Sequence, residues 1–582
     1  MKILLLFPPS WLPSQPFLSL PALTGFLRAQ GIEVIQRDIN IEFLETILRE
    51  KKAQKFFSRI KQELNKGPIR HHMDKYNLLR EAVEYLPLAS ERIEEAKDVL
   101  RSEGFYDIEK YAESLALIDK YLELVGALYY PSTVSVYTNS TRYSVYSSSD
   151  LISAIEDEEE NIFLDFFREH FLSSILDIRP NIVGISITST SQLLPGLTLA
   201  RLIKRANPDI HITVGGSIFT KLIDNLLLGV DAFFSFVDSF VVFEGEHALL
   251  ELANQLSGGK DLSKVPNLVY KTDGRVTINE PFYIEDVNNL PTPDYNGLPF
   301  GLYHSPRPVL PVQTSRGCYW GKCTFCNLHY DHRYYRPKGI DFIVRDIQTL
   351  KERHQTNYFF FADECIPIST LKRLVKVLPD LHIKWIGGVR LEEGLTRELT
   401  RDVRRAGCLK LVFGMESYSQ RVLNLMQKGI KRETVKRILE DCLEEGVATH
   451  IYTIVGFPTE TIAEAIESVN FILENKRLVS SRGFSFLPCL YEMEKHSPIT
   501  LNPSAYGLRR IMAPSKDDLS LGYAYEVKEG LSPQEAEALH EAIMHRVNET
   551  ISPFPYNYSM SDGLLYIDRH SARTMEAGKN PY

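Results

Sequence analysis

The stretch Ser315-Arg316-Gly317-Cys318-Tyr319-Trp320-Gly321-Lys322-Cys323-Thr324-Phe325-Cys326 places three thiols within nine residues, in the spacing C-x4-C-x2-C. It follows the short apolar run 308–312, which is typical of a buried strand. Three close thiolates can hold three irons of a [4Fe–4S] cluster and leave the fourth iron free for a substrate. Residues Cys318, Cys323 and Cys326 are therefore candidate metal ligands. Gly321 lies between the first two and tolerates backbone angles that other residues avoid.

Two other interpretations of these cysteines are open at this point. His329 extends the pattern to C-x4-C-x2-C-x2-H, which supplies the ligand types of a structural zinc site, although zinc ligands usually come as two separated pairs. Disulfides are not expected, because seven cysteines in 582 residues is an odd and sparse count. The N-terminus also lacks a charged and then apolar signal, which favours a reducing cytoplasm.

Length and composition set broad limits on the protein. A chain of 582 residues is long enough for about three or four domain-sized units. No apolar stretch approaches the ~18 residues that a membrane-spanning helix needs. A formal net charge of -9 gives no broad electrostatic reason to bind nucleic acid, so we expect neither a membrane nor a nucleic-acid partner.

The N-terminal part alternates between strand and helix patterns. Residues 2–7 predict a buried strand, 18–29 a helix, and 33–35 the start of a second strand. The alternation resumes with strands at 182–187 and 211–214 around a helix near 199–203. Such alternation favours a doubly wound, parallel Rossmann-like sheet whose ligand binds at the carboxyl ends of the strands. A flavodoxin-like domain without a large cofactor fits the same pattern.

Beyond the cysteines, strand patterns recur at intervals of one βα unit. The strand at 358–361 ends in Asp363 and Glu364, where side chains would point into the mouth of a (β/α) barrel. Capping of the following helix is the plain alternative for these acids. A strand at 383–390 ends in Arg390, a cation suited to a bidentate carboxylate contact or else a surface arginine. Cys365, Cys408, Cys442 and Cys489 are most simply buried small residues, and for Cys365 a chemical role stays open.

These motifs, taken in order, resemble the cobalamin-binding radical S-adenosylmethionine (SAM) enzymes. The likeness rests on the strand-Pro-Pro start, the Gly-Ile-Ser strand, the Gly-Gly and Glu-Gly-Glu turns, and the cysteine loop, whose usual spacing in that family is C-x3-C-x2-C. It covers residues 1–40 and about 176–490. The family implies an α/β fold in which a doubly wound cobalamin-binding domain with a helical insertion precedes a partial (β/α)6 TIM-like barrel.

The resemblance also implies binding sites for SAM. Leu411-Val412-Phe413-Gly414-Met415-Glu416-Ser417 is similar to the family's fourth-strand Gly-Ile-Glu-Ser, whose glutamate contacts the SAM ribose, and the likeness continues through Met426-Gln427-Lys428-Gly429. The run from Gly456 to Thr461 is similar to Gly-Phe-Pro-Gly-Glu-Thr, with Thr459 in place of a glycine. The residues expected to bind SAM are Phe325, Asp363, Glu364, Arg390, Glu416 and Gly456.

By position, the loops at the carboxyl ends of the first strands would border a cobalamin. The expected contacts are Pro9, Ser10, Ser186, Thr188, Gln192, Gly215, Gly216, Glu244 and Gly245. The Asp-x-His-x-x-Gly signature, which supplies an axial histidine in other corrinoid proteins, does not follow the first strand. We therefore expect no cobalt-bound histidine from that motif.

The expected domains are 1–40 with 176–285 for cobalamin, 41–175 as an inserted cap, 300–490 as the radical SAM barrel, and 491–582 as a C-terminal appendage. The insertion has charged helical spacing at 91–101 and a Tyr- and Ser-rich segment at 129–150 that predicts an irregular loop. In the appendage, residues 533–546 predict a helix and 563–569 a strand. The appendage is expected either to cap the bottom of the barrel or to recognise substrate.

The function implied by the resemblance is a radical reaction. SAM bound to the cluster would yield a 5'-deoxyadenosyl radical, and cobalamin would carry a methyl group to an unactivated carbon of a natural product or peptide, with flavodoxin or ferredoxin as the electron donor. Other radical SAM reactions, such as cyclisation, ring contraction or methylthiolation, are the alternative, and a non-enzymatic metal sensor is a third. The tRNA-acting methylthiolation enzymes usually carry further cysteines in an N-terminal domain, and no cysteine precedes Cys318 here.

Overall fold

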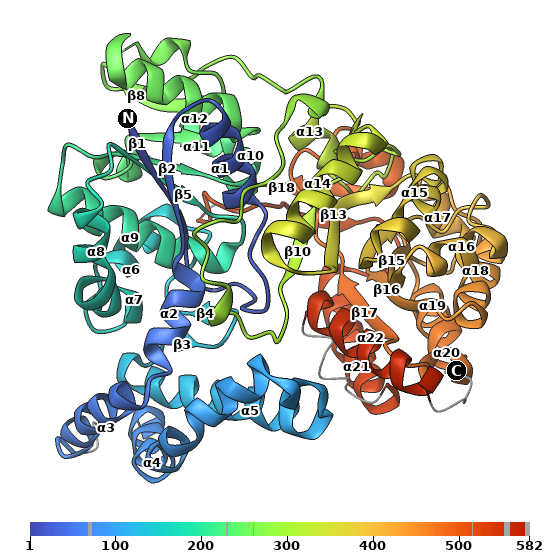
Figure 1. Cartoon of the computed structure of the whole chain (residues 1–582), viewed down its shortest axis with the longest axis horizontal. Helices are drawn as coiled ribbons and strands as arrows, with labels where there is room; N and C mark the ends of the chain where they lie inside the picture. Colours follow the sequence, from blue (N-terminus) through green and yellow to red (C-terminus); the bar gives the residue numbers. More distant parts are fainter. Residues whose placement is uncertain (68–72, 229–230, 260, 515, 552–558, 577–582) are drawn as a thin grey trace. The chain divides into compact units, whose positions relative to one another are not determined.

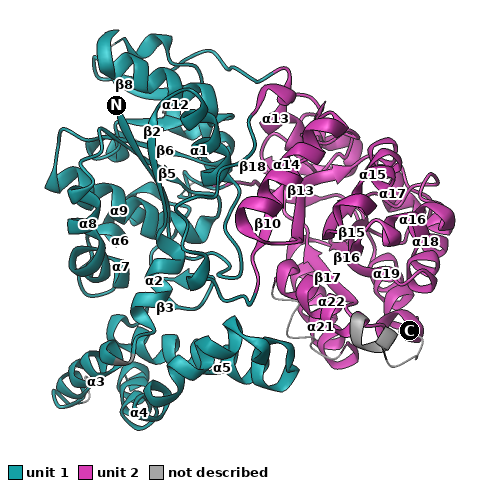
Figure 2. Cartoon of the chain, viewed as in Figure 1, with its two compact units in different colours: residues 1–284, 291–306, 515–520 teal, residues 285–290, 307–514, 521–582 magenta. Residues whose placement is uncertain are grey.

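A computed structural model describes the chain except for residues 68–72, 229–230, 260, 515, 552–558 and 577–582 (Figure 1). It divides into two compact units (Figure 2). Unit 1 comprises Met1–Ile284, Pro291–Pro306 and Ser515–Ser520. Unit 2 comprises Glu285–Leu290, Arg307–Pro514 and Leu521–Tyr582. Within the described residues, no helix combines the length and apolar composition that crossing a bilayer requires.

Unit 1 is built on a seven-stranded sheet of order β2-β1-β5-β6-β7-β8-β9. Its strands are β1 (Lys2–Phe7), β2 (Glu33–Asp38), β5 (Ile182–Ser186), β6 (His211–Gly215), β7 (Ser239–Val241), β8 (Leu268–Thr272) and β9 (Arg275–Ile278). The first five are parallel, as predicted, whereas β8 and β9 add an antiparallel edge that the sequence pattern did not predict. The strand order reverses between β1 and β5, and doubly wound sheets bind their ligands at the carboxyl ends of the strands at such a point.

Burial on both faces explains why the first strand is a continuous apolar run. Ile3, Leu4 and Leu6 of β1 are fully buried, and this is typical of a parallel sheet covered by helices on both sides. The connecting helices include α1 (Ser19–Ala29), α9 (Leu193–Ala206), α10 (Ser217–Lys221), α11 (Ile223–Leu228) and α12 (Gly245–Asn254).

The segment between β2 and β5 is mainly helical. It contains α2 (Ile39–Ile47), α3 (Glu50–Leu64), α4 (Met73–Arg101), α5 (Ile108–Gly126), α6 (Ser148–Glu156), α7 (Ile162–Phe166) and α8 (Leu172–Asp177). The part predicted to be irregular also holds a short antiparallel hairpin, β3 (Thr133–Val134) and β4 (Asn139–Ser140). A hairpin of two-residue strands is too short to leave a recognisable alternation in the sequence.

Unit 2 is a partial barrel of six parallel strands in the order β10-β13-β14-β15-β16-β17. They are β10 (Val309–Val312), β13 (Tyr358–Ile366), β14 (Lys384–Val389), β15 (Cys408–Glu416), β16 (Ala448–Val455) and β17 (Ser485–Leu490). The connecting helices are α14 (Ile340–His354), α15 (Ile368–Leu381), α16 (Arg397–Arg405), α17 (Gln420–Leu425), α18 (Arg432–Glu444), α19 (Ile462–Leu473) and α20 (Lys476–Val479). The predicted (β/α)6 barrel is confirmed.

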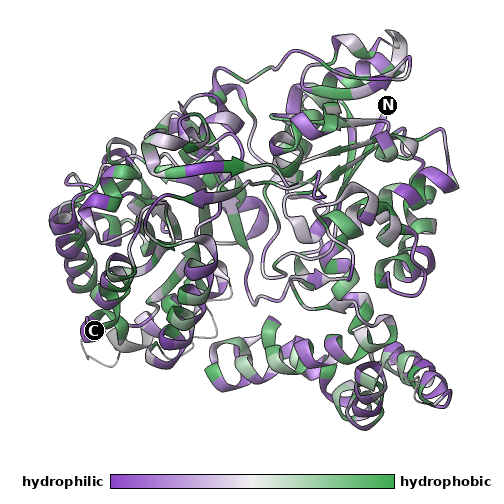
Figure 3. Cartoon of the chain, turned by 180° about the vertical axis from the view of Figure 1, so that it is seen from behind, coloured by the Kyte–Doolittle hydropathy of each residue, from purple (hydrophilic) through white to green (hydrophobic). Residues whose placement is uncertain are grey.

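Hydrophobic residues lie along the strands of both units, while the helices alternate hydrophobic and hydrophilic residues (Figure 3). In the barrel wall, Trp385 is fully buried and stacks on Phe361 at 4.8 Å between ring centroids. Strand β13 continues past Asp363 and Glu364 to Ile366, so the acidic pair lies within the strand rather than after it.

The C-terminal segment differs from the sequence prediction at residues 563–569. Helix α21 (Pro533–Thr550) forms as predicted, with a capping box between Ser532 and Glu535, but 563–569 belong to helix α22 (Met560–Glu576). A short apolar run does not distinguish a buried helix from a strand, and Leu564 and Leu565 are fully buried here. The antiparallel pair β18 (Leu508–Met512) and β19 (Ala524–Val527) precedes α21.

Helix α22 packs against β13, β14 and β15. Its Asp568 accepts a hydrogen bond of 2.8 Å from the Tyr358 hydroxyl and lies 3.8 Å from Lys384 Nζ. Tyr358 and Lys384 are the first residues of their strands. The helix therefore covers the amino ends of these strands, at the bottom of the barrel, and leaves the carboxyl ends as the functional mouth.

Candidate functional site

The cysteine loop begins after β10 and rests on the segment that follows α17. Trp320 Nε1 donates to Gln427 O at 2.9 Å, and Thr324 N donates to Met426 O at 3.0 Å. The Thr324 hydroxyl donates to Leu425 O at 3.1 Å. Residues 425–429 thus form a cradle for the loop, which gives the Met-Gln-Lys-Gly stretch a structural role.

Glycines shape the loop at two positions. Gly321 has φ +59° and its missing side chain would face open space, with only Cys318 O at 3.6 Å. This left-handed turn accommodates the additional residue between Cys318 and Cys323, because glycine adopts positive φ without steric cost. Gly429 is required for a different reason, since a Cβ there would lie 2.1 Å from the Trp320 ring.

The three loop thiols are free and partly buried. Burial raises the pKa of Cys323 and raises that of Cys326 to about 12. The Lys428 and Arg390 cations oppose this shift at Cys323 and favour the thiolate that iron requires. Three free thiols beside two buried cations fit an iron–sulfur cluster.

In the part of the chain that the structure describes, no three His, Cys, Asp or Glu side chains gather closely enough to hold a single metal ion, and His329 is exposed on α13 (Leu328–His332).

Asp363 fixes the start of the cysteine loop. Its carboxylate accepts from Thr314 N at 3.0 Å, from the Thr314 hydroxyl at 3.0 Å and from the Ser315 hydroxyl at 2.7 Å. The alternative of helix capping is wrong for this residue, because helix α15 has Pro367 at its N-cap and no side-chain cap. The neighbouring Glu364 is exposed.

Arg390 is buried, so its interpretation as a surface arginine is wrong. Its guanidinium stacks over the Trp320 ring at 4.1 Å, and its Nη2 donates to Lys428 O. Its buried Nε makes no hydrogen bond within the described residues, and Glu392 Oε2 lies 3.8 Å away. A buried guanidinium with an unused N–H fits the carboxylate of a bound amino acid such as the methionine part of SAM.

Glu416 and Lys428 form a buried ion pair. Lys428 Nζ lies 2.6 Å from Glu416 Oε1, and each side chain is only 10% exposed. Gly414 makes room for this pair, because a Cβ there would lie 2.2 Å from Glu416 Oε1 and 2.9 Å from Lys428 Nζ. Glu416 itself has a positive φ of 63°. A carboxylate held in this way can accept hydrogen bonds from vicinal hydroxyl groups such as those of ribose.

The turn after β16 holds Gly456, which has φ +88°. Its N–H donates to Glu460 Oε2 at 2.7 Å, and its carbonyl accepts a long hydrogen bond of 3.4 Å from the Tyr525 hydroxyl. The amide of Gly456 is therefore engaged inside the protein. Phe325 packs nearby against a buried hydrophobic cluster that includes Met426, Phe457, Tyr491 and Met493.

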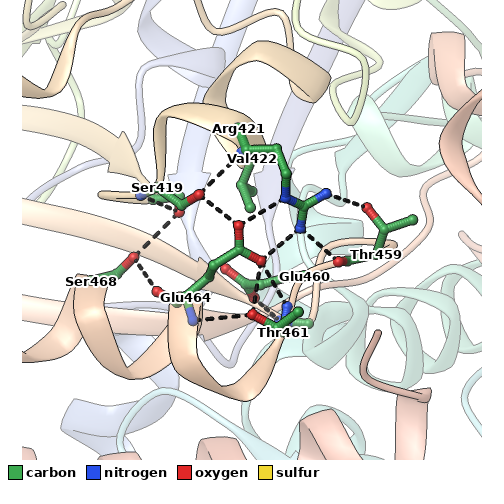
Figure 4. A network of polar contacts seen from close by, with 10 residues as sticks. Ser419, Arg421, Val422, Thr459, Glu460, Thr461, Glu464 and Ser468 are labelled. Atoms are coloured by element: carbon green, nitrogen blue, oxygen red, sulfur yellow. Dashed lines mark hydrogen bonds and ion pairs between the residues drawn. The ribbon is translucent and has the colours of Figure 1, made fainter. Parts of the chain in front are cut away.

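Arg421 clamps the same turn (Figure 4). Its Nη1 donates to the Thr459 hydroxyl at 3.0 Å and its Nη2 to Thr459 O at 2.7 Å, while Nε and Nη2 contact both oxygens of Glu464 at 2.8 and 2.6 Å. Thr459 has φ +70°, the conformation that the family's glycine would adopt without strain. The departure from glycine is thus accommodated by a side-chain clamp.

A buried polar group lies near the amino ends of β15, β16 and β17. Lys410 Nζ donates to Ser485 Oγ at 2.8 Å, and Ser485 Oγ lies 2.6 Å from His450 Nδ1. Burial lowers the pKa of Lys410 to about 7. Tyr452 lies two residues beyond His450, and Cys489 lies four residues beyond Ser485. Because side chains alternate along a strand, both are on the same face of the sheet as this group and nearer the carboxyl ends of the strands.

In unit 1 the residues predicted to border cobalamin lie at the carboxyl ends of β1, β5, β6 and β7. Gln192 is fully buried and shapes two loops, because its Nε2 donates to Pro8 O at 2.9 Å and its Oε1 accepts from Thr188 N at 3.0 Å. Glu244 Oε2 accepts from Ile284 N at 2.7 Å. The side chains of Gln192 and Glu244 therefore stabilise the loops through hydrogen bonds to the backbone.

The remaining residues predicted to border cobalamin leave an edge rich in hydroxyl groups. Ser10 is buried with φ +76°, and Pro9 beside it is also buried. Gly216 has φ +122° and a Cβ there would lie 1.9 Å from Ile187 O. Gly215 ends β6 and Gly245 begins α12. The partly exposed residues of the loop after β5 are Ser186, Thr188, Ser189, Thr190 and Ser191. Neutral hydroxyl groups suit the amide-rimmed, largely neutral periphery of a corrinoid.

Three residues were missed by sequence reasoning. Lys428 lay within a quoted likeness but was not assigned, and only the fold brings it to Glu416. Trp320 was part of the quoted cysteine loop, yet its stacking on Arg390 depends on a contact 70 positions away in the chain. Asn139 of the hairpin donates hydrogen bonds to Ser10 and Ser191 in two of these loops, and no signal in the sequence marks it.

Comparison with known families agrees with this geometry. Residues 312–472 match the radical SAM superfamily, and residues 151–253 match the B12 binding domain. An uncharacterized methyltransferase of Pyrococcus horikoshii is 27% identical over 336 residues, which are 55% of this chain and 71% of that protein. An anaerobic magnesium-protoporphyrin IX monomethyl ester cyclase of Rubrivivax gelatinosus is 28% identical over 319 residues, covering 52% of this chain and 56% of the relative.

Solved structures show the same fold. The radical SAM methyltransferase TsrM from Kitasatospora setae, with cobalamin and a [4Fe–4S] cluster bound, has a TM-score of 0.52 and 16% identity, covering 92% of this chain and 84% of that chain. The cobalamin-dependent radical enzyme OxsB, with aqua-cobalamin and SAM bound, has a TM-score of 0.52 and 17% identity, with coverage of 75% and 69%.

A B12 binding domain followed by a radical SAM domain defines the class of the protein. The chain combines these two domains in the order that the sequence predicted, and the cofactors of this class are a [4Fe–4S] cluster, SAM and cobalamin. The cysteine loop lies within the radical SAM match.

Proposed function

We propose that the protein is a radical SAM methyltransferase that transfers a methyl group, by way of cobalamin, to an unactivated carbon of a small molecule or peptide. The observation that carries the proposal is the presence of two features in one chain. The B12 domain has an edge rich in hydroxyl groups, and the barrel mouth has three free thiols and the Glu416–Lys428 ion pair. In this assignment, residues 1–40 and 176–285 serve the corrinoid, and 300–490 serve the cluster and SAM.

When bound, the cluster and SAM supply a 5'-deoxyadenosyl radical and the corrinoid supplies a transferable methyl group. Cys318, Cys323 and Cys326 would hold three irons through their thiolates. Lys428 and Arg390 place positive charge near Cys323 and would offset the negative charge that the thiolates bring to the loop.

The side chains around the mouth would orient SAM. Glu416 would accept hydrogen bonds from the ribose hydroxyls, and Arg390, held flat against Trp320, would meet the methionine carboxylate. Asp363 would act by fixing the first residues of the cysteine loop. Phe325 and the turn at Gly456 would border the adenine, with Glu460 holding the Gly456 amide in place.

The barrel would shield the reaction from water. Helix α22 covers the amino ends of the strands, and the buried Lys410–Ser485–His450 group lies near the same end of β15, β16 and β17. Substrate would therefore enter from the carboxyl ends of the strands, near Tyr452 and Cys489. Coverage of this end of the barrel would protect a reactive radical, because it excludes solvent from one side of the site.

The partners follow from this chemistry. The cluster needs one electron at a time, so we propose flavodoxin or ferredoxin as its donor in a reducing cytoplasm. The net charge of -9 gives no broad attraction for nucleic acid, which supports a small-molecule or peptide substrate.

Product analysis tests methyl transfer. Reconstituted protein is incubated with SAM carrying a deuterated methyl group, a reductant and candidate substrates. Methylation yields labelled product together with both S-adenosylhomocysteine and 5'-deoxyadenosine. Product formation with 5'-deoxyadenosine alone, and no label in the product, would reject the methyl transfer.

That second outcome would support radical cyclisation, the candidate favoured by the 28% identity to the magnesium-protoporphyrin monomethyl ester cyclase. Cyclisation needs the same radical but no methyl carrier. The matched control is Glu416→Ala, which should lower the yield of 5'-deoxyadenosine in either reaction because it weakens SAM binding.

A further inference from the structure

The hairpin β3–β4 of the inserted segment contacts two of the loops at the corrinoid edge. Asn139 Nδ2 donates to the Ser10 hydroxyl at 2.7 Å and to Ser191 O at 2.6 Å. The Thr138 hydroxyl lies 3.2 Å from the Ser191 hydroxyl. One carboxamide therefore joins the loop after β1 to the loop after β5.

These two loops follow the two strands between which the sheet order reverses. The sheet order β2-β1-β5-β6-β7 reverses direction between β1 and β5, and ligands of doubly wound sheets bind at this point. Asn139 spans this point, since its partners belong to the loops that follow β1 and β5. A corrin ring bound over the carboxyl ends of β1 and β5 would therefore contact Asn139, which bridges the two loops.

The backbone at this place is strained, which is typical of functional positions. Ser10 is 5% exposed and has φ +76°, a left-handed conformation that is uncommon for serine. The hydrogen bond from Asn139 fixes its hydroxyl in that conformation. Strain of this kind persists where the surroundings over-determine it.

We propose that Asn139 lies against the face of the corrin ring that is turned toward the strand ends, and that its carboxamide oxygen is a cobalamin contact. Both amide hydrogens are used within the protein, so the oxygen is the group left for a ligand. No donor to Oδ1 lies among the described residues, and the side chain is partly exposed. The oxygen can accept a hydrogen bond from a corrin side-chain amide or from water on cobalt. This inference rests on the cobalamin-dependent function proposed above.

The assignment changes the role of the insertion. The sequence predicted residues 41–175 as an inserted cap, and in this assignment the hairpin within the insertion contributes to the cofactor edge. The plain alternative is a structural clasp in which Asn139 only attaches the insertion to the α/β domain. The two interpretations differ in whether Asn139 affects cobalamin itself.

Affinity measurements separate these interpretations. Hydroxocobalamin is titrated into the full-length wild type, Asn139→Ala and Thr133→Val. Thr133 provides a matched control, because its hydroxyl lies 2.7 Å from the Ser140 hydroxyl in the same hairpin without reaching the loops. We expect Asn139→Ala to bind roughly five- to a hundred-fold more weakly and Thr133→Val to bind like the wild type. Equal affinity for all three would overturn the proposal and leave the clasp.

A spectroscopic variant tests the position relative to the ring. Asn139→His is loaded with aquacobinamide, which has no nucleotide base, and reduced to Co(II). Nitrogen splitting in its electron paramagnetic resonance spectrum, absent from the wild type, would place position 139 beneath cobalt. Bound cobinamide without such splitting would overturn that placement. A wild type that retains no corrinoid would instead contradict the proposed function, so the two failures are distinguishable.

Discussion

Lys428 Nζ lies 2.6 Å from Glu416 Oε1 in a pair that is almost completely buried. Glu416 is the residue expected to bind the SAM ribose, whereas Lys428 comes from the cradle beneath the cysteine loop. The pair therefore connects the proposed SAM site to the cysteine loop. Arg390 strengthens the connection, because its Nη2 donates to Lys428 O while its guanidinium stacks on Trp320.

Replacing Glu416 should weaken SAM binding without removing the cluster. Glu416→Ala deletes the hydrogen-bond acceptor for the nucleoside, and losing one such partner costs roughly 1 to 3 kcal/mol, about five- to a hundred-fold in affinity. SAM affinity is measured by equilibrium binding, and iron content confirms the cluster. The control is Glu393→Ala, because Glu393 forms an ion pair with Lys431 in which both side chains are exposed to solvent. Unchanged SAM affinity in Glu416→Ala would move the ribose contact elsewhere.

Replacing Lys428 should have a similar effect by a different route. Lys428→Met keeps the length of the side chain but leaves the Glu416 carboxylate buried without its cation, which is strongly unfavourable. We expect SAM affinity to fall by about ten-fold or more, with partial recovery in Lys428→Arg. Lys431→Met is the surface control. The double variant of Glu416 and Lys428 should lose less SAM-binding free energy than the two single variants lose together, because the residues act as a pair. A loss in the double variant equal to that sum would argue against the pair.

The order of the barrel strands and the position of the cysteine loop were predictable from the sequence, because buried strands and glycine-bounded turns recur at intervals of one βα unit. Contacts between distant segments were not. Asp363 and Arg390 were predicted as SAM contacts from their strand positions, but their bonds to Thr314 and to Lys428 depend on how the loops fold back. Helix α22 was mistaken for a strand, because a buried helix and a buried strand can share one apolar pattern.

The clamp on Thr459 should contribute stability that depends on pH. Hydrogen bonds from Arg421 are the main cause that lowers the pKa of Glu464 to about 2. A carboxyl group with a depressed pKa stabilises the fold above its unfolded value and loses this contribution as pH falls toward the folded value. Arg421→Met should therefore be less stable than the wild type by about 1 to 2 kcal/mol at pH 7, a modest loss because the arginine is partly exposed. The difference in thermal midpoint should shrink between pH 5 and pH 3; a constant difference would contradict the clamp.

Glu460 should show the opposite dependence. Burial raises its pKa to about 8, so the folded protein keeps this group protonated at pH 7 while the unfolded chain ionises near its usual value of 4.5. A raised pKa costs the fold stability as pH rises from about 4.5 to 8. Glu460→Gln removes the ionisation and retains the shape, so its thermal midpoint relative to the wild type should increase from pH 5 to pH 8. A pH-independent difference would show that the group titrates normally.

The most direct test of the central claim is the electron paramagnetic resonance spectrum of the anaerobically reconstituted, reduced protein with and without SAM. The account predicts a [4Fe–4S] signal that changes when SAM is added, since SAM would bind the iron left free by Cys318, Cys323 and Cys326, and each Cys→Ala variant should lose it. A protein that holds one zinc and shows no iron–sulfur signal would contradict the account, as would a cluster whose spectrum SAM leaves unchanged.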